Sequence, residues 1–329
     1  MFLYVTIILA ICLVDLSSTL PIIDQSGLTW IYPILTNPSA TDQRWGNRIP
    51  PRVFRVPRIT ISSSYHNVTG APPSHVSASS PPLHEKRYTN GPDDRVRWDD
   101  RSYPYSAMGR LTNPKSLCSA SLIGPRHVAT ARHCWAPNVP YHFAPAYNGG
   151  EVFGGAEVTE VLMLTEKDIP EGVCAENADW AIFVLDRRLG EPQGFLGANT
   201  IDSAHVERPL FYNIGYPGDL DGASRPYRQQ SISVYSKQRC DANGPLDTNA
   251  DASLGQSGGP LWLEENGNYW QYGVMARLTL FDGQLTWTTF TGGAALGGRR
   301  CVRTRAMALG DIYAGCLASF ETPNEENST

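Results

Sequence analysis

The sequence predicts an all-β domain in the part of the chain that begins near Tyr88. Many short apolar runs are separated by clusters of Gly, Pro, Asn and Asp, a pattern that favours strands joined by turns. The stretch from Tyr88 to Thr329 is long enough to bury one substantial core. Six of the seven cysteines lie in it, an even number that is typical of a disulfide framework in an oxidising compartment.

Residues 1–18 are predicted to be a signal peptide. The apolar stretch 2–14 is too short to span a bilayer comfortably, and the small residues Ser17, Ser18 and Thr19 follow it. The alternative is a buried strand or helix at the N-terminus. No other stretch is long and apolar enough to cross a membrane, so we expect a secreted, extracellular protein without a membrane attachment after signal removal.

Residues 19–87 are predicted to be a Pro-rich propeptide with little regular structure. They contain ten of the 25 prolines and show no sustained hydrophobic period. The segment ends in Lys86-Arg87, a dibasic pair of the kind that processing enzymes cut, although such pairs also occur uncut on surfaces. Its seven Lys or Arg and three Asp or Glu give a net charge of +4, against −8 from Tyr88 onward. We therefore expect the propeptide to be a partner of the following domain, attracted to it by charge.

Charge and composition exclude several other classes of function. A net charge of −8 from Tyr88 onward argues against a nucleic-acid-binding surface. The sequence contains no CxxC pair and no HxxxH spacing, so we expect no metal site and no cofactor. We expect a monomer. N-glycosylation signals occur at Asn67 in the propeptide and at Asn327. We expect poor glycosylation at Asn327, because it lies so close to the end of the chain.

The string Gly255-Gln256-Ser257-Gly258-Gly259-Pro260 is the most specific motif of the chain. At average residue usage the pattern GxSGGP arises by chance in about one chain of this length in a few thousand. A serine hydroxyl is a weak nucleophile until a neighbouring base takes its proton and a third group fixes the tautomer of that base. The motif therefore predicts a nucleophilic serine and requires a histidine and an acid elsewhere in the chain.

His133 and Asp179 are the best candidates for these two partners. His133 lies beside a cysteine in the string ATARHC, directly after an apolar run that predicts a pair of strands. Asp179 precedes WAIFVL, an unbroken apolar run that predicts a buried strand. A carboxylate at the mouth of such a strand can be held in a desolvated pocket.

These motifs resemble the chymotrypsin-type serine peptidases, and among them the glutamyl-endopeptidase-like branch. The matching strings are TARHC, ADWAIFVLD, GYPGD, DASLGQSGGP and, from 93 to 111, DDRVRWDDRSYPYSAMGRL. The resemblance covers roughly 93–317. It implies that residues 88–320 form two packed antiparallel six-stranded β-barrels with a short C-terminal helix, followed by a polar tail at 321–329.

The resemblance also implies roles for individual residues. Ser257 would attack the scissile carbonyl of a polypeptide substrate, His133 would carry the proton, and Asp179 would orient His133. The backbone N–H groups of Gly255 and Ser257 would form the oxyanion hole. The expected activity is that of a serine endopeptidase working through an acyl-enzyme. The alternative is an inactive homologue that serves as an extracellular binding module.

The family pattern predicts one disulfide and leaves the others open. Cys118 and Cys134 match the bridge across the loop of the catalytic histidine. The cysteines at 174, 240, 301 and 316 allow three connectivities, and a pairing of Cys301 with Cys316 is favoured.

Gln256 predicts how such an enzyme is not activated. In cascade-type trypsin-like enzymes an Asp precedes the serine and pairs with the new N-terminal ammonium. The neutral amide of Gln256 cannot form that ion pair. We therefore expect the propeptide either to block the enzyme or to assist its folding, and its removal to expose the cleft.

Three residues are candidates for substrate binding. Asp251 lies where trypsin keeps its pocket carboxylate, which would favour a basic P1 residue, or it is turned away into a hydrogen-bonded turn. Met275 aligns with a His of the glutamate-selective members, a departure that questions glutamate specificity. Arg277 would supply a positive charge in its place, or it is a surface residue.

Overall fold

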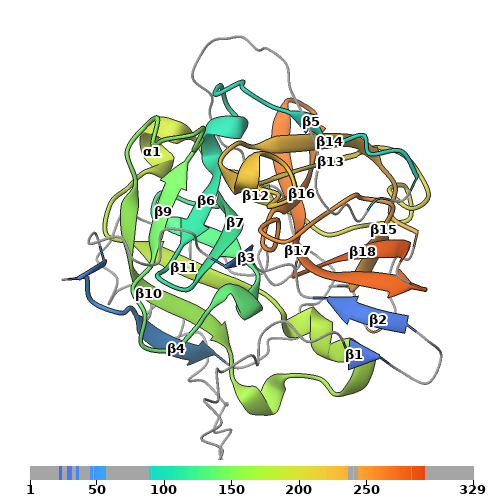
Figure 1. Cartoon of the computed structure of the whole chain (residues 1–329), viewed down its shortest axis with the longest axis horizontal. Helices are drawn as coiled ribbons and strands as arrows, with labels where there is room; N and C mark the ends of the chain where they lie inside the picture. Colours follow the sequence, from blue (N-terminus) through green and yellow to red (C-terminus); the bar gives the residue numbers. More distant parts are fainter. Residues whose placement is uncertain are drawn as a thin grey trace, which may run out of the picture.

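The chain folds into two β-sheets with few helices between their strands (Figure 1). Within the described ranges the helices are one four-residue α-helix, α1 (Gly190–Gln193), and short 3-10 turns. The all-β prediction is therefore confirmed. The structure, a computed structural model, describes residues 22–23, 28–31, 35–36, 45–46, 48–56, 89, 91–235, 240, 244–282 and 284–292.

Six antiparallel strands close on themselves to form the first barrel. They are β6 (Met108–Thr112), β7 (Ser116–Leu122), β8 (His127–Thr130), β9 (His142–Pro145), β10 (Ala156–Leu164) and β11 (Ala181–Leu185). The order around the barrel is β11, β8, β7, β6, β9, β10, and β10 pairs back with β11. Each of these strands pairs with a neighbour on both sides along part of its length, so the barrel is a rigid support for residues at the strand ends.

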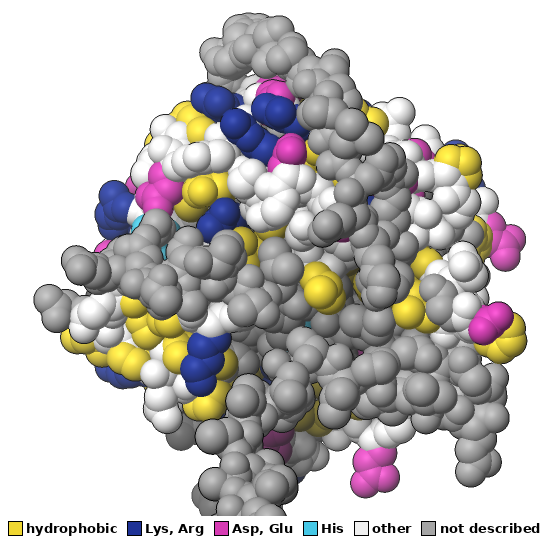
Figure 2. Space-filling model, viewed as in Figure 1, with side chains coloured by type: hydrophobic (Ala, Val, Ile, Leu, Met, Phe, Trp, Pro, Cys, Tyr) yellow, Lys and Arg dark blue, Asp and Glu magenta, His cyan; other side chains and the backbone are white. Residues whose placement is uncertain are grey.

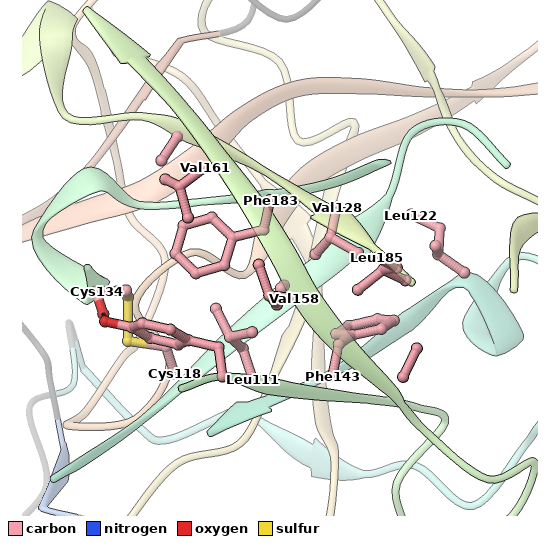
Figure 3. Packing of buried hydrophobic residues seen from close by; sticks show 14 of the residues in the cluster. Leu111, Cys118, Leu122, Val128, Cys134, Phe143, Val158, Val161, Phe183 and Leu185 are labelled. Atoms are coloured by element: carbon pink, nitrogen blue, oxygen red, sulfur yellow. Dashed lines mark hydrogen bonds between the residues drawn. A yellow bond between two sulfur atoms is a disulfide. The ribbon is translucent and has the colours of Figure 1, made fainter. Parts of the chain in front are cut away.

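Apolar side chains fill the inside of the first barrel (Figure 3). Val128, Phe143, Val161 and Phe183 are each 0% exposed. Strand β11 is buried on both faces, because Phe183 points into this core while Ile182 packs in a second cluster with residues of the other sheet. An unbroken apolar run suits such a strand, and the prediction of a buried strand after Asp179 is confirmed.

Six longer strands of the second sheet follow the first barrel in the chain. They are β13 (Phe211–Gly215), β14 (Tyr227–Ile232), β15 (Leu246–Thr248), β16 (Pro260–Glu265), β17 (Asn268–Phe281) and β18 (Gln284–Gly292). Short strands β5 (Val96–Arg97) and β12 (Gly197–Ala198) pair with β14 and β17.

The second sheet curls toward a barrel without completing a ladder. Its two ends, β14 and β15, are joined through the isolated bridge Val234–Thr248. Of the two predicted six-stranded barrels, the first is thus a closed barrel and the second is a curled sheet. The predicted C-terminal helix and the polar tail lie outside the described residues.

Four short strands lie in the described part of segment 19–87. They are β1 (Ile22–Ile23), β2 (Leu28–Ile31), β3 (Leu35–Thr36) and β4 (Arg52–Val56). β2 pairs with β1 and β17, β3 pairs with β7, and β4 pairs in parallel with β10 (Figure 1, blue strands). Local patterns do not predict these strands, because the segment has no hydrophobic period of its own. The strands form because the two sheets of the following domain supply their hydrogen-bonding partners.

Acidic and basic side chains are interspersed on the described surface of the face shown in Figure 2. No helix in the described ranges is long and apolar enough to span a membrane. The predicted signal peptide lies outside those ranges.

Candidate active site

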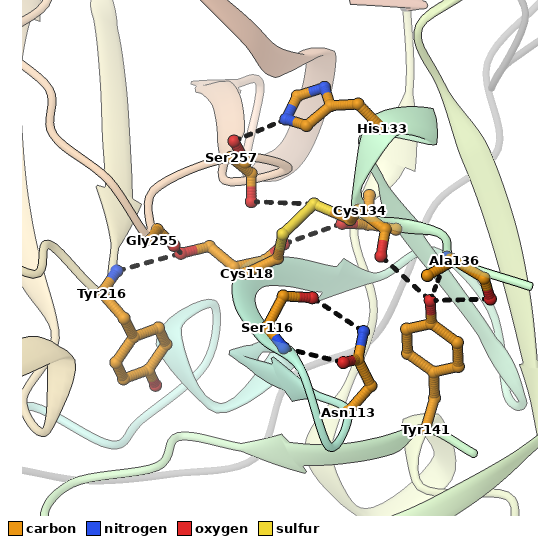
Figure 4. Close-up of a disulfide and its surroundings, with 12 residues drawn as sticks. Asn113, Ser116, Cys118, His133, Cys134, Ala136, Tyr141, Tyr216, Gly255 and Ser257 are labelled. Atoms are coloured by element: carbon orange, nitrogen blue, oxygen red, sulfur yellow. Dashed lines mark hydrogen bonds between the residues drawn. A yellow bond between two sulfur atoms is a disulfide. The ribbon is translucent and has the colours of Figure 1, made fainter. Parts of the chain in front are cut away.

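His133 lies directly after the first barrel's strand β8, in the 3-10 turn η3 (Arg132–Cys134). The predicted disulfide joins Cys118 of β7 to Cys134, with 6.3 Å between their Cα atoms (Figure 4). The hydroxyl of Tyr141 donates to the carbonyl of Cys134 at 3.1 Å. A covalent bond and a buried hydrogen bond thus fix the residue that follows the histidine.

The two ring nitrogens of His133 contact the two other predicted catalytic residues. Nδ1 lies 2.6 Å from Oδ2 of Asp179. Nε2 lies 2.6 Å from Oγ of Ser257 (Figure 4). The backbone N–H of His133 also donates to Oδ1 of Asp179 at 2.9 Å. With the ring proton on Nδ1, Nε2 is an acceptor for the Ser257 hydroxyl proton, which is the tautomer that general-base chemistry needs.

Asp179 is presented at the end of a long 3-10 segment, η5 (Gly172–Ala178). Its backbone N–H donates to the carbonyl of Glu176 at 2.9 Å, and its side chain is 12% exposed. A disulfide between Cys174 and Cys240 ties this segment to the second sheet's connecting loop. The acid is therefore held by links to both sheets.

The Cys174–Cys240 bridge also resolves part of the disulfide pattern. Of the three connectivities, it is the one that accompanies the favoured pairing of Cys301 with Cys316. That second pairing lies outside the described residues.

Ser257 lies on the nucleophile loop, which we define as residues 253–259, just before β16. Gly258 has a φ of +80°, and a Cβ there would meet Oγ1 of Thr130 at 2.1 Å and the carbonyl oxygen of Ser119 at 2.4 Å. Only glycine fits both the conformation and the space. The first glycine of the motif, Gly255, has a φ of +98°.

Ser119 of β7 connects the nucleophile loop to the first barrel. Its backbone N–H donates to the carbonyl of Ser257 at 2.8 Å. Its hydroxyl donates to the carbonyl of Gly255 at 2.9 Å and accepts the N–H of Tyr216 at 2.9 Å. Nothing in the sequence distinguishes Ser119 from other serines, so sequence reasoning missed it.

The carbonyls of Gly255 and Ser257 therefore accept hydrogen bonds from Ser119. Among the hydrogen bonds of the described residues, neither amide donates to another group. Two free N–H groups that flank a nucleophile are the donors that a developing oxyanion requires.

The three candidate specificity residues are all buried and have structural partners. Oδ2 of Asp251 accepts the backbone N–H of Asp94 at 3.3 Å, a contact between residues far apart in the sequence. Met275 is 0% exposed, and its N–H donates to the carbonyl of Gly259 at 2.9 Å. The guanidinium of Arg277 forms a buried ion pair with the carboxylate of Glu176, so Arg277 is not a surface residue. Their roles in substrate binding stay predictions.

Within the part of the chain that the structure describes, no three His, Cys, Asp or Glu side chains are grouped so that they could hold a metal ion. The arrangement that remains is a hydrogen-bonded acid, base and hydroxyl beside two free amides. These are the groups that acyl transfer through a serine requires.

Known proteins resemble this chain in sequence and in fold. The family model for trypsin matches residues 95–277, more than half of the chain. A glutamyl endopeptidase of Bacillus licheniformis is 28% identical over 186 residues, which are 54% of this chain and 55% of that protein's length. The solved structure of a Glu endopeptidase in complex with MPD matches with a TM-score of 0.51 and 20% identity, covering 69% of this chain and 98% of the other. The chain belongs to the trypsin family and is similar to glutamyl endopeptidases.

Proposed function

We propose that this protein is a secreted serine endopeptidase that cleaves polypeptides through an acyl-enzyme on Ser257. One observation carries the proposal: Oγ of Ser257, both ring nitrogens of His133 and the carboxylate of Asp179 form one hydrogen-bonded chain with two contacts of 2.6 Å. The two disulfides of the described residues fit an oxidising, extracellular compartment.

The chemistry follows from this chain of contacts. Ser257 Oγ attacks the scissile carbonyl carbon while its proton moves to Nε2 of His133, and the amides of Gly255 and Ser257 bind the oxyanion. His133 then gives the proton to the leaving amine, which leaves an ester on Ser257. Water attacks that ester in the same way, its proton passes through His133, and the hydroxyl of Ser257 is restored. Asp179 keeps the proton of His133 on Nδ1 throughout.

Labelling of the catalytic serine tests this function. We expect the chain cut after Arg87 to react with a fluorophosphonate at Ser257 and to hydrolyse peptide and ester substrates. Ser257→Ala should abolish labelling and lower kcat by about 10⁶. An absence of both labelling and hydrolysis in the cut wild-type protein would leave the inactive binding module as the better description.

The propeptide is the proposed inhibitor of the uncut chain. Support comes from the edges that its strands use: β2 pairs with Leu278–Phe281 of β17, and β3 pairs with Ser116 and Leu117 of β7. Both edges are next to residues that hold the nucleophile loop, Met275 and Ser119. An extended peptide bound in the cleft would need free strand edges of this kind, so the propeptide must leave them before a substrate can pair there.

Three ion pairs support the expected attraction by charge between propeptide and domain. Two are at 2.9 Å, and all three join an arginine of the propeptide to a glutamate of the first barrel or the turn after it: Arg48–Glu157, Arg52–Glu160 and Arg55–Glu166. Each has at least one partner that is a quarter or more exposed, and such pairs contribute about 0–1 kcal/mol. Strand pairing therefore carries most of the attachment, and we expect high salt alone to leave the uncut chain inhibited.

A cleavage profile on a peptide library tests the specificity residues. An acidic preference at P1 would support Arg277, and a basic preference would support Asp251. A preference for neither charge would remove both residues from substrate recognition.

A further inference from the structure

Arg95 lies beneath the nucleophile loop with its guanidinium buried. It comes directly before β5, which pairs with β14 of the second sheet, and its side chain is 0% exposed. The string that contains it, 93–111, carries a family resemblance but no assigned role. Nothing in the mechanism above uses this cation.

The guanidinium is saturated by three partners. Nη1 donates to Oε1 of Gln256 at 2.9 Å. Nη2 donates to Oδ2 of Asp219 at 2.6 Å, and Nε donates to Oδ1 of Asp93 at 3.0 Å. The side chains of Asp93 and Asp219 are only 6% and 4% exposed. The cation therefore neutralises two buried carboxylates and binds the residue that precedes the nucleophile.

The same partners fix the backbone on both sides of Gly255. Oε1 of Gln256 accepts the N–H of Ser253 at 2.9 Å as well as the bond from Arg95. The carboxylate of Asp219 accepts the hydroxyl of Ser253, and the N–H of Gly218 donates to the carbonyl of Leu254 at 2.7 Å. Residues 253, 254 and 256 are all tied to this network, so the peptide plane that carries the Gly255 amide has little freedom.

The charge of Arg95 is permanent in this setting. Burial lowers its pKa, but hydrogen bonds and charges from Asp93 and Asp219 outweigh burial and raise the pKa above its ordinary value. Removing the cation would leave the negative charge of two buried carboxylates without a neutralising guanidinium, which is strongly destabilising locally.

We propose that Arg95 is a positioning residue that holds the oxyanion amide of Gly255 in its active orientation, in place of a new N-terminal ammonium. Cascade-type trypsin-like enzymes use that ammonium against an Asp before the serine. Here the residue is Gln256, and an internal guanidinium meets its amide oxygen. The loop is therefore formed without help from the N-terminus that a cut after Arg87 creates. This inference rests on the proposed peptidase function.

Substitutions of Arg95 in the full chain, processed at its own dibasic site, test the inference. Loss of one oxyanion donor lowers kcat by about 10² to 10³. We expect Arg95→Gln to lower kcat by about 10²-fold and Arg95→Lys by about tenfold, with KM changed less than about threefold in both. Affinity for a peptide boronate, which mimics the tetrahedral state, should fall by the same factor as kcat/KM. Arg97→Gln is the matched control, because Arg97 lies two residues further along, in β5, and pairs with Asp99 instead.

A second experiment moves the N-terminus. Replacing Lys86 and Arg87 by Ala and placing the dibasic pair at Thr89→Lys and Asn90→Arg makes the processed chain begin at Gly91 instead of Tyr88. We expect kcat within about twofold of the wild-type value, since no ammonium is needed. A loss of more than tenfold would contradict an internal cation as the organiser.

The outcomes separate the inference from the function. Wild-type turnover in a folded Arg95→Gln and Arg95→Lys protein overturns the inference alone. If Arg95→Gln does not fold, Arg95→Lys and the moved N-terminus still decide. No turnover and no labelling in wild-type protein removes the proposed function and the inference with it.

Discussion

The two halves of the candidate site are held by different kinds of interaction. His133 follows a closed barrel with an apolar core and a disulfide, whereas Ser257 lies on a loop held by glycine conformations and a buried polar network around Arg95. Apolar swaps of similar volume cost less than about 1.5 kcal/mol, whereas breaking a buried ion pair costs about 3–5 kcal/mol. The half with the serine should therefore be the more sensitive to a single polar or glycine substitution.

Replacing Asp179 by Asn removes a charge from the half with the histidine without changing the shape of the side chain. Asp179→Asn should lower kcat by about 10⁴, because an amide can donate to Nδ1 and then stabilises the wrong tautomer of His133. The thermal unfolding midpoint should change little, since the two side chains have nearly the same volume. Asp186→Asn, at the other end of β11 and exposed, is the control and should keep full activity. An Asp179→Asn enzyme within tenfold of wild type would show that this half acts through position alone.

Replacing Gly258 by Ala strains the half with the serine. Gly258→Ala would force a side chain into the left-handed region and against Thr130 and Ser119, and we expect a loss of about 2–4 kcal/mol in the free energy of unfolding. Gly267→Ala is the matched control, because Gly267 has a φ of +75° but open space around its Cβ. It should lose only about 1–2 kcal/mol. Chemical denaturation measures both, and equal losses would mean that packing around the loop is loose.

The third and smallest effect concerns the first barrel alone and is read from pH. Burial lowers the pKa of His127 to about 4, with Arg126 and Arg188 adding to the shift. Its unfolded value is about 6.5, so the unfolded chain binds the extra proton between these limits and stability falls as pH falls through this window. The loss by pH 4 is about 3 kcal/mol.

His127→Gln should flatten that part of the stability profile. His142, in the same barrel, should give the opposite dependence of stability on pH. Burial lowers its pKa, but Glu151 and Glu157 on its two ring nitrogens outweigh burial and raise it. The stability that His142 contributes is present below about pH 6.5 and is lost as pH rises through the raised folded pKa. Equal slopes for wild type and His127→Gln between pH 4 and 6.5 would contradict a neutral, buried His127.

The sequence led to the triad because each member lies in a local string with its own pattern. His133 follows an apolar strand and stands beside a cysteine, Asp179 precedes an unbroken apolar run, and Ser257 lies in a glycine-rich motif. The same approach missed Ser119, whose hydroxyl acts on the nucleophile loop from another strand. It also left open whether Arg277 faces a substrate, and the buried partner Glu176 is 101 residues away.

What the sequence determined by itself is the all-β class and the three residues of the candidate triad. These follow from local patterns of apolar residues, glycines and polar groups. The tertiary structure decided that four short strands of segment 19–87 join the two sheets and that Cys174 pairs with Cys240. It also placed Arg95 against Gln256, 161 residues further along the chain. The physical reason is that a buried charge is acceptable only where the fold brings its partners, and local periodicity carries no record of contacts over such distances.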